Sequence, residues 1–361
     1  MSTSRLSALL GIEHPLIQGP FGGGLSSVEL AAAVSEGGGL GSYGAHVLEP
    51  RAIGPLVAQI RSATSRPFAV NLWVPQDEER GAPPDTAELA AHTERLRPYY
   101  EELGVPGPPP AEALAHPAFQ AQAAALLAAR PPVVSFVMGV PPRDLVEAAH
   151  ARGIALIGTA TTVEEALALE AAGMDAVVAS GSDAGGHRGA FLRPVRESLV
   201  GTFSLVPQVA DALSVPVIAA GGIADGRGIA AALTLGADGV QIGTGFLATT
   251  ESGASAVHKR ALGGPEARTT VLTRLFSGRT ARGIPNAFVR DLAAHEDEVP
   301  AYPVQNALMR PIRAAAISQG RADRASLWAG QAAALSGTSR TAREYLDQLV
   351  AELAKCRTGK G

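Results

Sequence analysis

The amino-acid sequence alternates short apolar runs with longer amphipathic segments, and this alternation restricts the possible folds more than any other feature of the chain. Most runs are bounded by Gly or Pro and are followed by a helical pattern of roughly 10 to 15 residues. Strands that alternate with helices form parallel sheets, because each helical crossover returns the chain to the same end of the sheet. The runs at 133–137 and 215–220 are apolar almost throughout, which is typical of strands covered on both faces. The pattern therefore predicts an α/β fold.

Eight such runs occur, and eight parallel strands with crossover helices close a TIM barrel. The predicted strands are 15–21, 39–43, 68–74, 133–138, 155–159, 176–180, 217–221 and 240–243. Helix starts are indicated by good N-cap residues ahead of apolar runs, namely Ser27, Thr162 and Asp225. Helix ends are indicated by glycines that suit a left-handed C-terminal position, namely Gly37, Gly173 and Gly236. We therefore expect a (β/α)8 barrel.

Two segments are too long for the minimal repeat. The first, at about 76–131, contains two amphipathic patterns, 85–103 and 112–129, and is expected to be a helical insertion that carries the third helix. The second begins after residue 250, where the chain becomes helical and rich in Arg and Ala, with no further strand expected. We therefore predict a barrel over residues 1–250 and a mainly helical C-terminal region over 251–361 that packs on it.

Composition excludes several classes of function. The formal net charge is -4 and the basic residues are scattered, so nucleic-acid binding is not expected. Cys356 is the single cysteine, which excludes an intramolecular disulfide, and no His, Asp or Glu cluster has the spacing of a metal site. Neither a signal peptide nor an 18-residue apolar stretch is evident. We expect a cytoplasmic protein that contacts no membrane, and the oligomeric state stays open.

The loops after the last two predicted strands indicate a phosphate site. TIM barrels build active sites from the loops at the carboxyl ends of their strands, and loops seven and eight often hold a phosphate. Here these loops, 220–226 and 241–245, are rich in glycine directly before helical segments, so backbone N–H groups can approach an anion. Tight turns without a ligand are the alternative. A dinucleotide-type spacing at 39–44 is less favoured, because it follows a helix and coincides with the second strand.

The most unusual local sequence, Ser-Gly-Ser-Asp-Ala-Gly-Gly-His-Arg-Gly at 180–189, follows the sixth strand directly. Imidazole titrates near neutral pH, so His187 is the best candidate for a general base that takes a proton from a carbon acid. A purely structural histidine is the alternative, and His46 after the second strand is a weaker candidate. The remaining histidines are expected to be solvated or to cap helices: His14, His92, His116, His150, His258 and His295.

Polar residues also interrupt two of the apolar strands. Asn71 lies in the third and Gln241 in the eighth, and a buried amide needs partners, which either a cofactor or the protein core can supply. Phe21 and Trp73 are expected to pack in the protein instead of stacking on a ligand. The stretch 181–185 only approximates a nucleophile elbow, so acyl transfer is not favoured.

Several of these segments, in the same order, resemble the nitronate monooxygenases, formerly 2-nitropropane dioxygenases, whose FMN-binding barrel is related to that of flavin-dependent enoyl-ACP reductases. The segments that carry the resemblance are 14–20, 67–72, 183–189, 216–225, 236–247 and 277–284. The resemblance implies a flavoprotein with FMN as cofactor and His187 as catalytic base. Together with the glycine loops it predicts these cofactor contacts: Gln18, Gly19, Asn71, Ser180, Gly185, Gly186, Gly221, Gly222, Gln241, Ile242, Gly243 and Thr244. The candidate substrate pocket comprises Phe21, Gly22, His46 and Met138.

The activity that the resemblance implies is monooxygenation of alkyl nitronates, such as propionate 3-nitronate, with O2 by one-electron flavin chemistry, without NAD(P)H. Two departures from the family pattern concern the flavin ring: Ser180 stands where many members carry glutamine, and residues 21–24 replace a more usual Met-Ala-Gly-Gly. An enoyl-ACP reductase that uses NAD(P)H and FMN is the close alternative. A flavin- or phosphate-binding protein without catalysis is an alternative of a different class.

Overall fold

The computed structural model describes residues 4–76, 86–110, 117–337 and 339–358. Its centre is a sheet of eight parallel strands in the order β1-β9-β8-β6-β5-β4-β3-β2. These strands are β1 (Leu16–Gln18), β2 (Gly41–Gly44), β3 (Phe68–Trp73), β4 (Val133–Val137), β5 (Ala155–Ala160), β6 (Ala176–Ser180), β8 (Val217–Ala220) and β9 (Gly239–Ile242). The ends of this order meet where Ile17 and Leu40 form a parallel bridge. The sheet thus closes into the predicted TIM barrel, and all eight predicted strands are confirmed.

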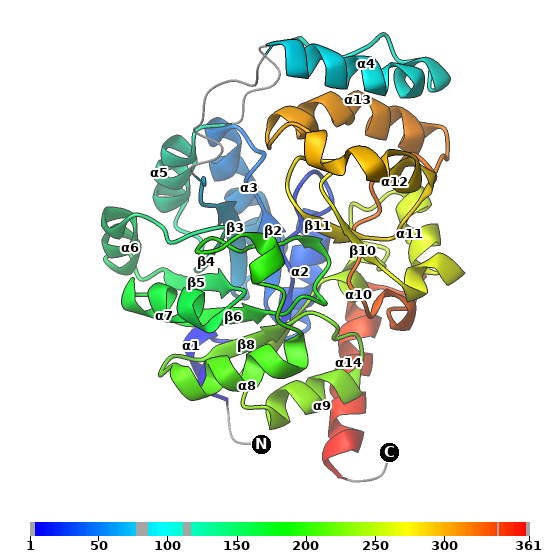
Figure 1. Cartoon of the computed structure of the whole chain (residues 1–361). Helices are drawn as coiled ribbons and strands as arrows, with labels where there is room; N and C mark the ends of the chain where they lie inside the picture. Colours follow the sequence, from blue (N-terminus) through cyan, green and yellow to red (C-terminus); the bar gives the residue numbers. More distant parts are fainter. Residues whose placement is uncertain (1–3, 77–85, 111–116, 338, 359–361) are drawn as a thin grey trace.

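A ring of helices surrounds the barrel, one after each of these strands (Figure 1). The ring consists of α2 (Val28–Glu36), α3 (Pro50–Ala63), α5 (Phe119–Ala129), α6 (Arg143–His150), α7 (Val163–Ala171), α8 (Thr202–Ala212), α9 (Gly226–Thr234) and α14 (Ala342–Arg357). The predicted N-caps are confirmed, because the side chains of Ser27, Thr162 and Asp225 each accept a backbone N–H from the first turn.

The predicted helix ends are confirmed at two of three positions. Gly173 and Gly236 have φ angles of 94° and 100°, in the left-handed region that favours glycine. The prediction was wrong for Gly37, which has a φ of -74° and is the last right-handed residue of the turn. Gly38 takes the left-handed position instead, with a φ of 89°. In a run of three glycines, local chemistry does not decide which of them reverses the chain.

The amino-terminal end of the barrel is closed by helix α1 (Arg5–Leu10), below the strands in Figure 1. Leu6 and Leu10 of this helix pack in one buried cluster with Ile17 of β1 and Ile218 of β8. Each buried Leu or Ile contributes about 1.5 to 3 kcal/mol relative to exposure. The lower end of the barrel is therefore filled by apolar side chains.

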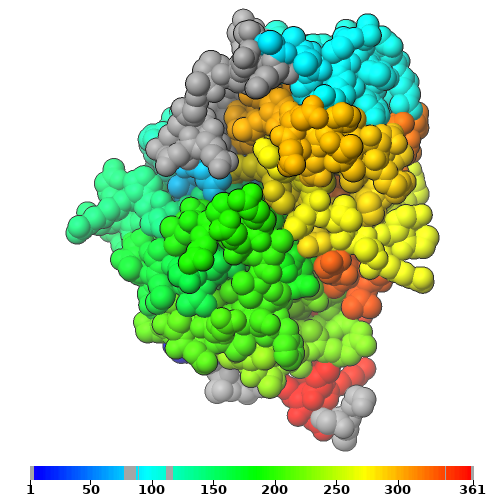
Figure 2. All heavy atoms as spheres, viewed as in Figure 1, coloured from blue at the N-terminus to red at the C-terminus, as the bar shows by residue number. Residues whose placement is uncertain are grey.

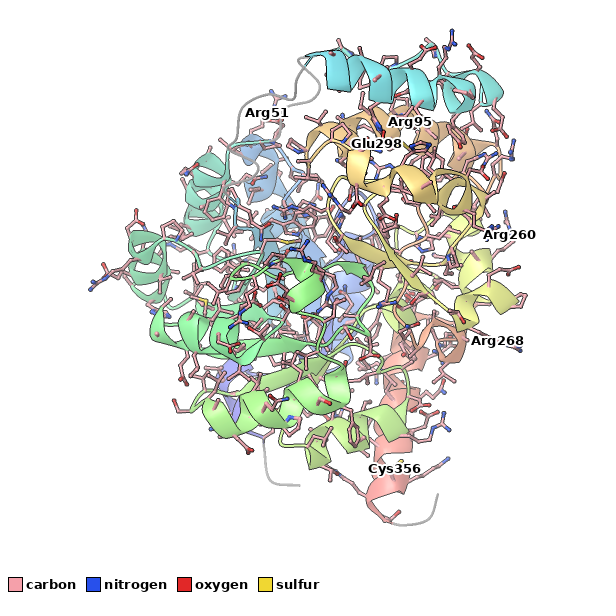
Figure 3. All side chains as sticks on the ribbon, in the orientation of Figure 1. Arg51, Arg95, Arg260, Arg268, Glu298 and Cys356 are labelled. Atoms are coloured by element: carbon pink, nitrogen blue, oxygen red, sulfur yellow. The ribbon has the colours of Figure 1, made fainter. Side chains whose placement is uncertain are left out.

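The predicted insertion leaves the barrel and returns to it. Helix α4 (Thr86–Glu102) lies against α13 (Val304–Ser318), on the side of the molecule away from α1 (Figure 1). The Tyr100 hydroxyl donates to the carbonyl of Leu308 over 2.8 Å. Figure 3 shows Arg95 of α4 beside Glu298, and their ion pair spans 2.5 Å. Helix α5 then packs on α3 as the third helix of the ring, as predicted.

The chain after residue 250 is mainly helical, with α11 (Ala256–Leu262), α12 (Ala287–Leu292) and α13 following the short α10 (Thr244–Leu247). The expectation that no further strand occurs there was wrong. Strands β10 (Val271–Thr273) and β11 (Ala281–Gly283) pair antiparallel, and β11 also pairs with β7 (Gly186–His187) from the loop after β6. A strand of two or three residues is too short to show an alternation of apolar and polar residues. Such a segment becomes a strand only through its hydrogen bonds to a segment far away in the sequence.

Helix α14 completes the ring between α9 and α2, where Figure 1 shows it in red. Its Tyr345 is fully buried, and the hydroxyl donates to the carbonyl of Ala224 over 2.7 Å. Cys356 lies near its carboxyl end, far from the carboxyl ends of the barrel strands (Figure 3). This helix belongs to the ring around the barrel although it lies beyond residue 250. The predicted division into a barrel over residues 1–250 and a helical region over 251–361 therefore stays a proposal.

In the space-filling view of Figure 2, the cyan surface of α4 continues into the orange surface of α13, so these helices form one cover beside the barrel. A second buried cluster, separate from the barrel core, joins them through Leu96, Tyr100, Met309 and Ile312. No helix in the described part of the chain is both long and apolar enough to cross a bilayer.

Candidate functional site

His187 lies on β7, directly after the loop that leaves β6. Gly186 has a φ of 74°, which lets the chain turn into β7, and His187 pairs with Ala281 of β11. The stretch before the histidine is therefore an ordered turn and strand that is fixed by the C-terminal region. This pairing places the imidazole at the carboxyl end of the barrel strands, where TIM barrels carry out their chemistry.

The side chain of His187 is hydrogen-bonded to a serine from the C-terminal region. Its Nε2 lies 2.8 Å from Oγ of Ser277, which is fully buried and also lies 3.1 Å from the carbonyl oxygen of Arg279. Burial, with a smaller contribution from the positive charge of Arg313 on α13, lowers the pKa of His187 to about 3. The imidazole is therefore neutral at pH 7 and has a lone pair that can accept a proton.

Aromatic rings surround this imidazole. Trp73, the last residue of β3, meets His187 edge-on with ring centroids 4.9 Å apart, and Trp328 lies 5.5 Å from it. Trp73 also stacks on His46, with ring centroids 3.7 Å and planes 6° apart. These rings shield His187 from much of the solvent, and this burial is the main cause of its low pKa.

Three of the four candidate substrate-pocket residues lie together. A Cβ added to Gly22 would lie only 1.9 Å from Cε1 of His46, so glycine is required for this close approach. The ring of Phe21 faces the loop after β9, where its Cε1 would lie 3.7 Å from a Cβ added to Gly243. Met138, at the end of β4, has a φ of 75°, a conformation that costs a residue other than glycine of order 1 to 3 kcal/mol. Such strain is concentrated at functional sites.

The predicted phosphate loops converge at the ends of β6, β8 and β9. Gly221 and Gly222 have φ angles of 106° and 69°. A Cβ on Gly221 would lie 2.8 Å from the Ala184 amide nitrogen, and one on Gly222 would lie 3.2 Å from Cβ of Asp183. The loop after β8 therefore packs directly on the loop that leads to His187, which only glycine permits.

Backbone N–H groups in these loops are open to a ligand. Those of Gly222, Gly243 and Thr244 form no hydrogen bond with any described residue. The Thr244 hydroxyl oxygen accepts the N–H of Gly330 over 2.9 Å, which leaves its own proton to donate elsewhere. A set of unpaired amides and one hydroxyl around glycines is the donor set that a phosphate requires.

A segment of the C-terminal region crosses these loops. A Cβ on Gly185 would lie 2.4 Å from the nitrogen of Gly330, so the two backbones touch. The next N–H, that of Gln331, donates to the carbonyl of Asp183 over 2.9 Å. The residues 329–331 thus join the loop after β6 to the loop after β9, and they hold Gly185, Gly186 and Thr244 in one place.

The predicted polar contacts differ in how well the protein itself satisfies them. The amide of Gln18 is satisfied, because Oε1 accepts the N–H of Ser42 over 2.9 Å and Nε2 donates to the carbonyl of Gly19. The nitrogen of Asn71 donates to the carbonyl and hydroxyl of Ser135, while Oδ1 has no partner among the described residues. The side chain of Gln241 and the hydroxyl of Ser180 also form no hydrogen bond in the described part of the chain. These three groups are free to contact a cofactor.

The backbone atoms of two further candidates, Gly19 and Ile242, join the end of β1 to the end of β9. Gly19 donates its N–H to the carbonyl of Ile242 over 2.9 Å, and a Cβ on Gly19 would lie 3.3 Å from Cα of Gly243. Gly19 therefore brings the end of β1 against the loop after β9. The buried side chain of Ile242 packs in the core, so only its main chain and its neighbour Gly243 face this junction.

Two buried charged residues hold the loop around His187. The Arg188 guanidinium donates to the carbonyls of Ser180 and Gly181 over 2.7 and 2.6 Å, and its Nε has no partner in the described chain. Glu165, fully buried on α7, accepts both the N–H and the hydroxyl of Thr161 with one oxygen and the N–H groups of Phe191 and Leu192 with the other. The chain is therefore anchored on both sides of the histidine.

The expectation that the remaining histidines are solvated or capping was wrong for two of them. His92 is buried on α4, and its Nε2 lies 2.7 Å from Oε1 of Gln305. His258 is buried on α11 and lies 2.9 Å from the carbonyl of Trp328. Both are core histidines that tie the C-terminal cover together. His116 lies outside the described residues.

Sequence reasoning missed Ser277 and Trp328, which contact His187, and Arg313, whose positive charge contributes to its low pKa. Each comes from the C-terminal region, 90 or more positions away, and no local motif marks it. The one available signal is the segment 277–284, which is among those that resemble the family. The antiparallel pairing of β11 with β7 is what brings Ser277 to the imidazole.

Comparisons with known proteins agree with this architecture. The chain is 42% identical to a probable nitronate monooxygenase of Staphylococcus haemolyticus over 97% of both chains. The structure superposes on nitroalkane oxidase from Streptomyces ansochromogenes with a TM-score of 0.89 and 39% identity, covering 99% of this chain and 100% of the other. FabK from Thermotoga maritima matches with a TM-score of 0.76 and 30% identity, covering 99% and 98%.

The family profile of nitronate monooxygenase matches residues 3–352, which is nearly the whole chain. Both the relatives and the fold therefore agree with the motifs at 183–189 and 236–247 on which the sequence resemblance rested. The protein is an oxidoreductase enzyme and belongs to the nitronate monooxygenase family.

Proposed function

We propose that this enzyme is an FMN-dependent nitronate monooxygenase that oxidises alkyl nitronates, such as propionate 3-nitronate, with O2. The observation that carries the proposal is the neutral imidazole of His187, held by Ser277 at the end of the barrel where the glycine loops converge. The likeness to nitroalkane oxidase from Streptomyces ansochromogenes supports the substrate class.

The residues present fit FMN. The open N–H groups of Gly222, Gly243 and Thr244 would hold its phosphate. Oδ1 of Asn71, with Ser180 and Gln241, would face the polar edges of its ring system. When bound, FMN would accept an electron from the nitronate and pass it to O2, chemistry that amino-acid side chains do not supply.

The role proposed for His187 is to hold or take the proton at the substrate carbon. Ser277 has one hydroxyl proton, and we assign it to the carbonyl of Arg279, so that Nε2–H of His187 donates to Oγ of Ser277. Nδ1 then carries the lone pair. The surrounding rings of Trp73 and Trp328 shield the imidazole from solvent, which favours its neutral form and strengthens electrostatic interactions with a bound anion.

The purified enzyme tests the proposal directly. A visible spectrum with flavin bands establishes the cofactor, and oxygen uptake is then compared for propionate 3-nitronate, ethylnitronate and neutral nitroethane. Oxygen uptake that depends on nitronate and needs no NADH is expected. A colourless protein that takes up no FMN, or a flavoprotein that oxidises none of these compounds, would contradict the proposal.

The likeness to FabK favours one alternative, an enoyl-ACP reductase with NAD(P)H and FMN. The same preparation distinguishes the two, because the reductase oxidises NADH in the presence of a crotonyl thioester. Identity to FabK is 30%, against 39% to nitroalkane oxidase and 42% to the probable nitronate monooxygenase, so the monooxygenase is the better supported function. We further propose that O2 and a small-molecule nitronate are the partners and that the enzyme acts in the cytoplasm.

A further inference from the structure

Arg282 of β11 is a buried arginine that reaches from the C-terminal region to the loop after β6. Its Nε donates to the carbonyl of Ser182 over 2.8 Å, and its Nη1 donates to the carbonyl of Thr270 over 2.9 Å. Burying a guanidinium costs free energy unless its N–H groups find acceptors. In Arg282 the acceptors are carbonyl oxygens, and one of them belongs to the loop that leads to His187.

A second contact from the same region holds the next carbonyl of this loop. The N–H of Gln331 donates to the carbonyl of Asp183 over 2.9 Å, and its side-chain Oε1 accepts the hydroxyl of Thr270 over 2.8 Å. Thr270 is therefore bonded to both Arg282 and Gln331. This network ties two successive carbonyls of the loop to the C-terminal region.

The two carbonyls before them, at residues 180 and 181, accept from the guanidinium of Arg188. Four consecutive carbonyl oxygens, 180–183, are thus held by two arginines and one backbone N–H. A carbonyl oxygen repels an anion, whereas an amide N–H attracts one. The N–H groups of Asp183 and Gly185 form no hydrogen bond within the part of the chain that the structure describes. The loop therefore keeps donors available for an anion while its acceptors are occupied.

This loop is one wall of the candidate phosphate site. A Cβ added to Gly222, in the loop after β8, would lie 3.2 Å from Cβ of Asp183. On the other side, Gly330 donates its N–H to the hydroxyl of Thr244 in the loop after β9, directly before the contact of Gln331. The three loops are therefore in contact, and the position of the loop after β6 sets the space between them.

We propose that Arg282 is a positioning residue for the phosphate of FMN, holding the carbonyl oxygens of the loop after β6 away from the anion. It acts through the loop, because Nε and Nη1 are bonded to carbonyl oxygens. The guanidinium also offsets the charge of Asp183, whose carboxylate accepts the N–H and the hydroxyl of Thr202 beside these loops. The inference rests on the proposed cofactor and adds a residue that the glycine loops require.

The experiment compares FMN with riboflavin, which lacks the phosphate, on enzyme freed of its flavin. In Arg282→Met, the Kd of FMN, measured by flavin fluorescence, is expected to rise about 10- to 100-fold, because charge-assisted hydrogen bonds that hold the loop are lost. The Kd of riboflavin should stay within about threefold, since riboflavin presents no anion to this loop. A purely structural role would weaken both flavins alike.

Arg282→Lys provides a second, milder variant. It keeps the charge but cannot bond Ser182 and Thr270 with a rigid fork, so the Kd of FMN should rise about three- to tenfold, with riboflavin unaffected. Arg61→Met is the matched control, because Arg61 also donates to a carbonyl, that of Ala129 over 3.0 Å, outside the site. It should bind both flavins as the wild type does, and thermal unfolding of each variant shows whether the fold has changed.

Three outcomes overturn the inference. They are equal losses of FMN and riboflavin affinity in Arg282→Met, wild-type FMN affinity in Arg282→Lys, and a loss of FMN affinity in Arg61→Met as large as in Arg282→Met. A wild-type protein that binds FMN no better than riboflavin refutes the phosphate site and this inference with it. A protein that prefers FMN as expected but oxidises no nitronate refutes the proposed activity alone.

Discussion

Nε2 of His187 and the hydroxyl oxygen of Ser277 lie 2.8 Å apart, although 90 positions separate the two residues in the chain. The contact depends on β11, which pairs with β7 and brings the C-terminal region to the mouth of the barrel. It restricts the orientation of the imidazole and, with the Ser277 proton assigned to the carbonyl of Arg279, places the imidazole proton on Nε2.

Ser277→Ala should leave a shielded imidazole N–H without an acceptor, at a cost of about 1 to 3 kcal/mol. We expect kcat/KM with a nitronate to fall roughly tenfold or more, with flavin content unchanged. Ser252→Ala is the control, because Ser252 is also buried and donates to the carbonyl of Leu247 over 2.6 Å, away from His187. Similar losses of kcat/KM in the two variants would contradict a specific role of Ser277 in orienting His187.

His187→Asn should abolish most turnover while FMN stays bound, since the glycine loops and not the imidazole are proposed to hold the cofactor. General acid-base groups contribute roughly 10²- to 10⁴-fold to rate, and a loss in that range is expected in steady-state oxygen uptake. His150→Asn, at an exposed histidine on α6, should behave as wild type. Full activity of His187→Asn on both neutral nitroalkanes and nitronates would contradict the base role.

Gly221→Ala should weaken FMN binding. The φ of 106° is unfavourable for any L side chain, and the new Cβ would meet the Ala184 nitrogen at 2.8 Å, which forces the two loops apart. We expect the dissociation constant of FMN, measured by flavin fluorescence, to rise at least about tenfold, since local strain of 1 to 3 kcal/mol acts on the cradle itself.

Gly153→Ala is the matched control for backbone strain. Gly153 has a φ of 69°, and a Cβ there would meet nothing within 4 Å. This variant should lose a similar amount of unfolding free energy, roughly 1 to 2 kcal/mol, yet bind FMN as the wild type does. Weaker FMN binding in both variants would show that stability, and not the cradle, controls affinity.

Acid should destabilise the enzyme through buried histidines. Burial lowers the pKa of His258 to about 4, against the opposing effect of its hydrogen bond to the Trp328 carbonyl. The unfolded chain takes up this proton below about pH 6.5 and the folded protein only near pH 4. The stability from this group is therefore fully present above pH 6.5 and is lost as the pH falls toward 4, by about 1.4 kcal/mol per pH unit.

His258→Gln, which keeps a side-chain N–H for the Trp328 carbonyl, should flatten this dependence in urea unfolding between pH 6.5 and 4. His295→Gln, at an exposed position beside Glu298, should retain the wild-type slope. The explanation fails if His258→Gln and wild type lose the same free energy over this range, after allowance for His187, whose pKa of about 3 acts in the same direction.

Glu165→Ala should be strongly destabilising. The carboxylate is fully buried and accepts four hydrogen bonds from Thr161, Phe191 and Leu192, so its removal leaves buried donors unpaired at a cost of about 3 to 5 kcal/mol. Thermal and urea unfolding measure the loss. Its neighbour Glu164, which is largely exposed, provides the control, and Glu164→Ala should cost less than about 0.5 kcal/mol.

The barrel was predictable because its signals are local. A strand buried on both faces must be apolar along its length, and a helix that begins beside it needs a capping side chain, so Ser27, Thr162 and Asp225 mark the repeat wherever it occurs. The choice between Gly37 and Gly38, and the existence of β10 and β11, depend on contacts with other segments. The local sequence pattern carries no information about such contacts.

The candidate site likewise has one part that the sequence could predict and one part that it could not. His187, Gly221 and Thr244 could be proposed from the sequence because the carboxyl ends of barrel strands face one side, so position along the chain implies position in space. The buried state of His92 and His258 was not predicted, since a helical histidine shows no sign of its neighbours. Arg313 was missed for the same reason, because a single arginine on an amphipathic helix is usually solvated.

The sequence alone determined the eight-stranded barrel, the end of it at which the candidate site lies and the imidazole and glycine loops placed there, because each depends on the spacing of apolar and turn residues along the chain. Tertiary structure alone decided that this imidazole is neutral and that Ser277 lies within hydrogen-bond distance of it. Burial and charge depend on everything that surrounds a group in space, and the residues around His187 lie 90 or more positions away from it in the chain.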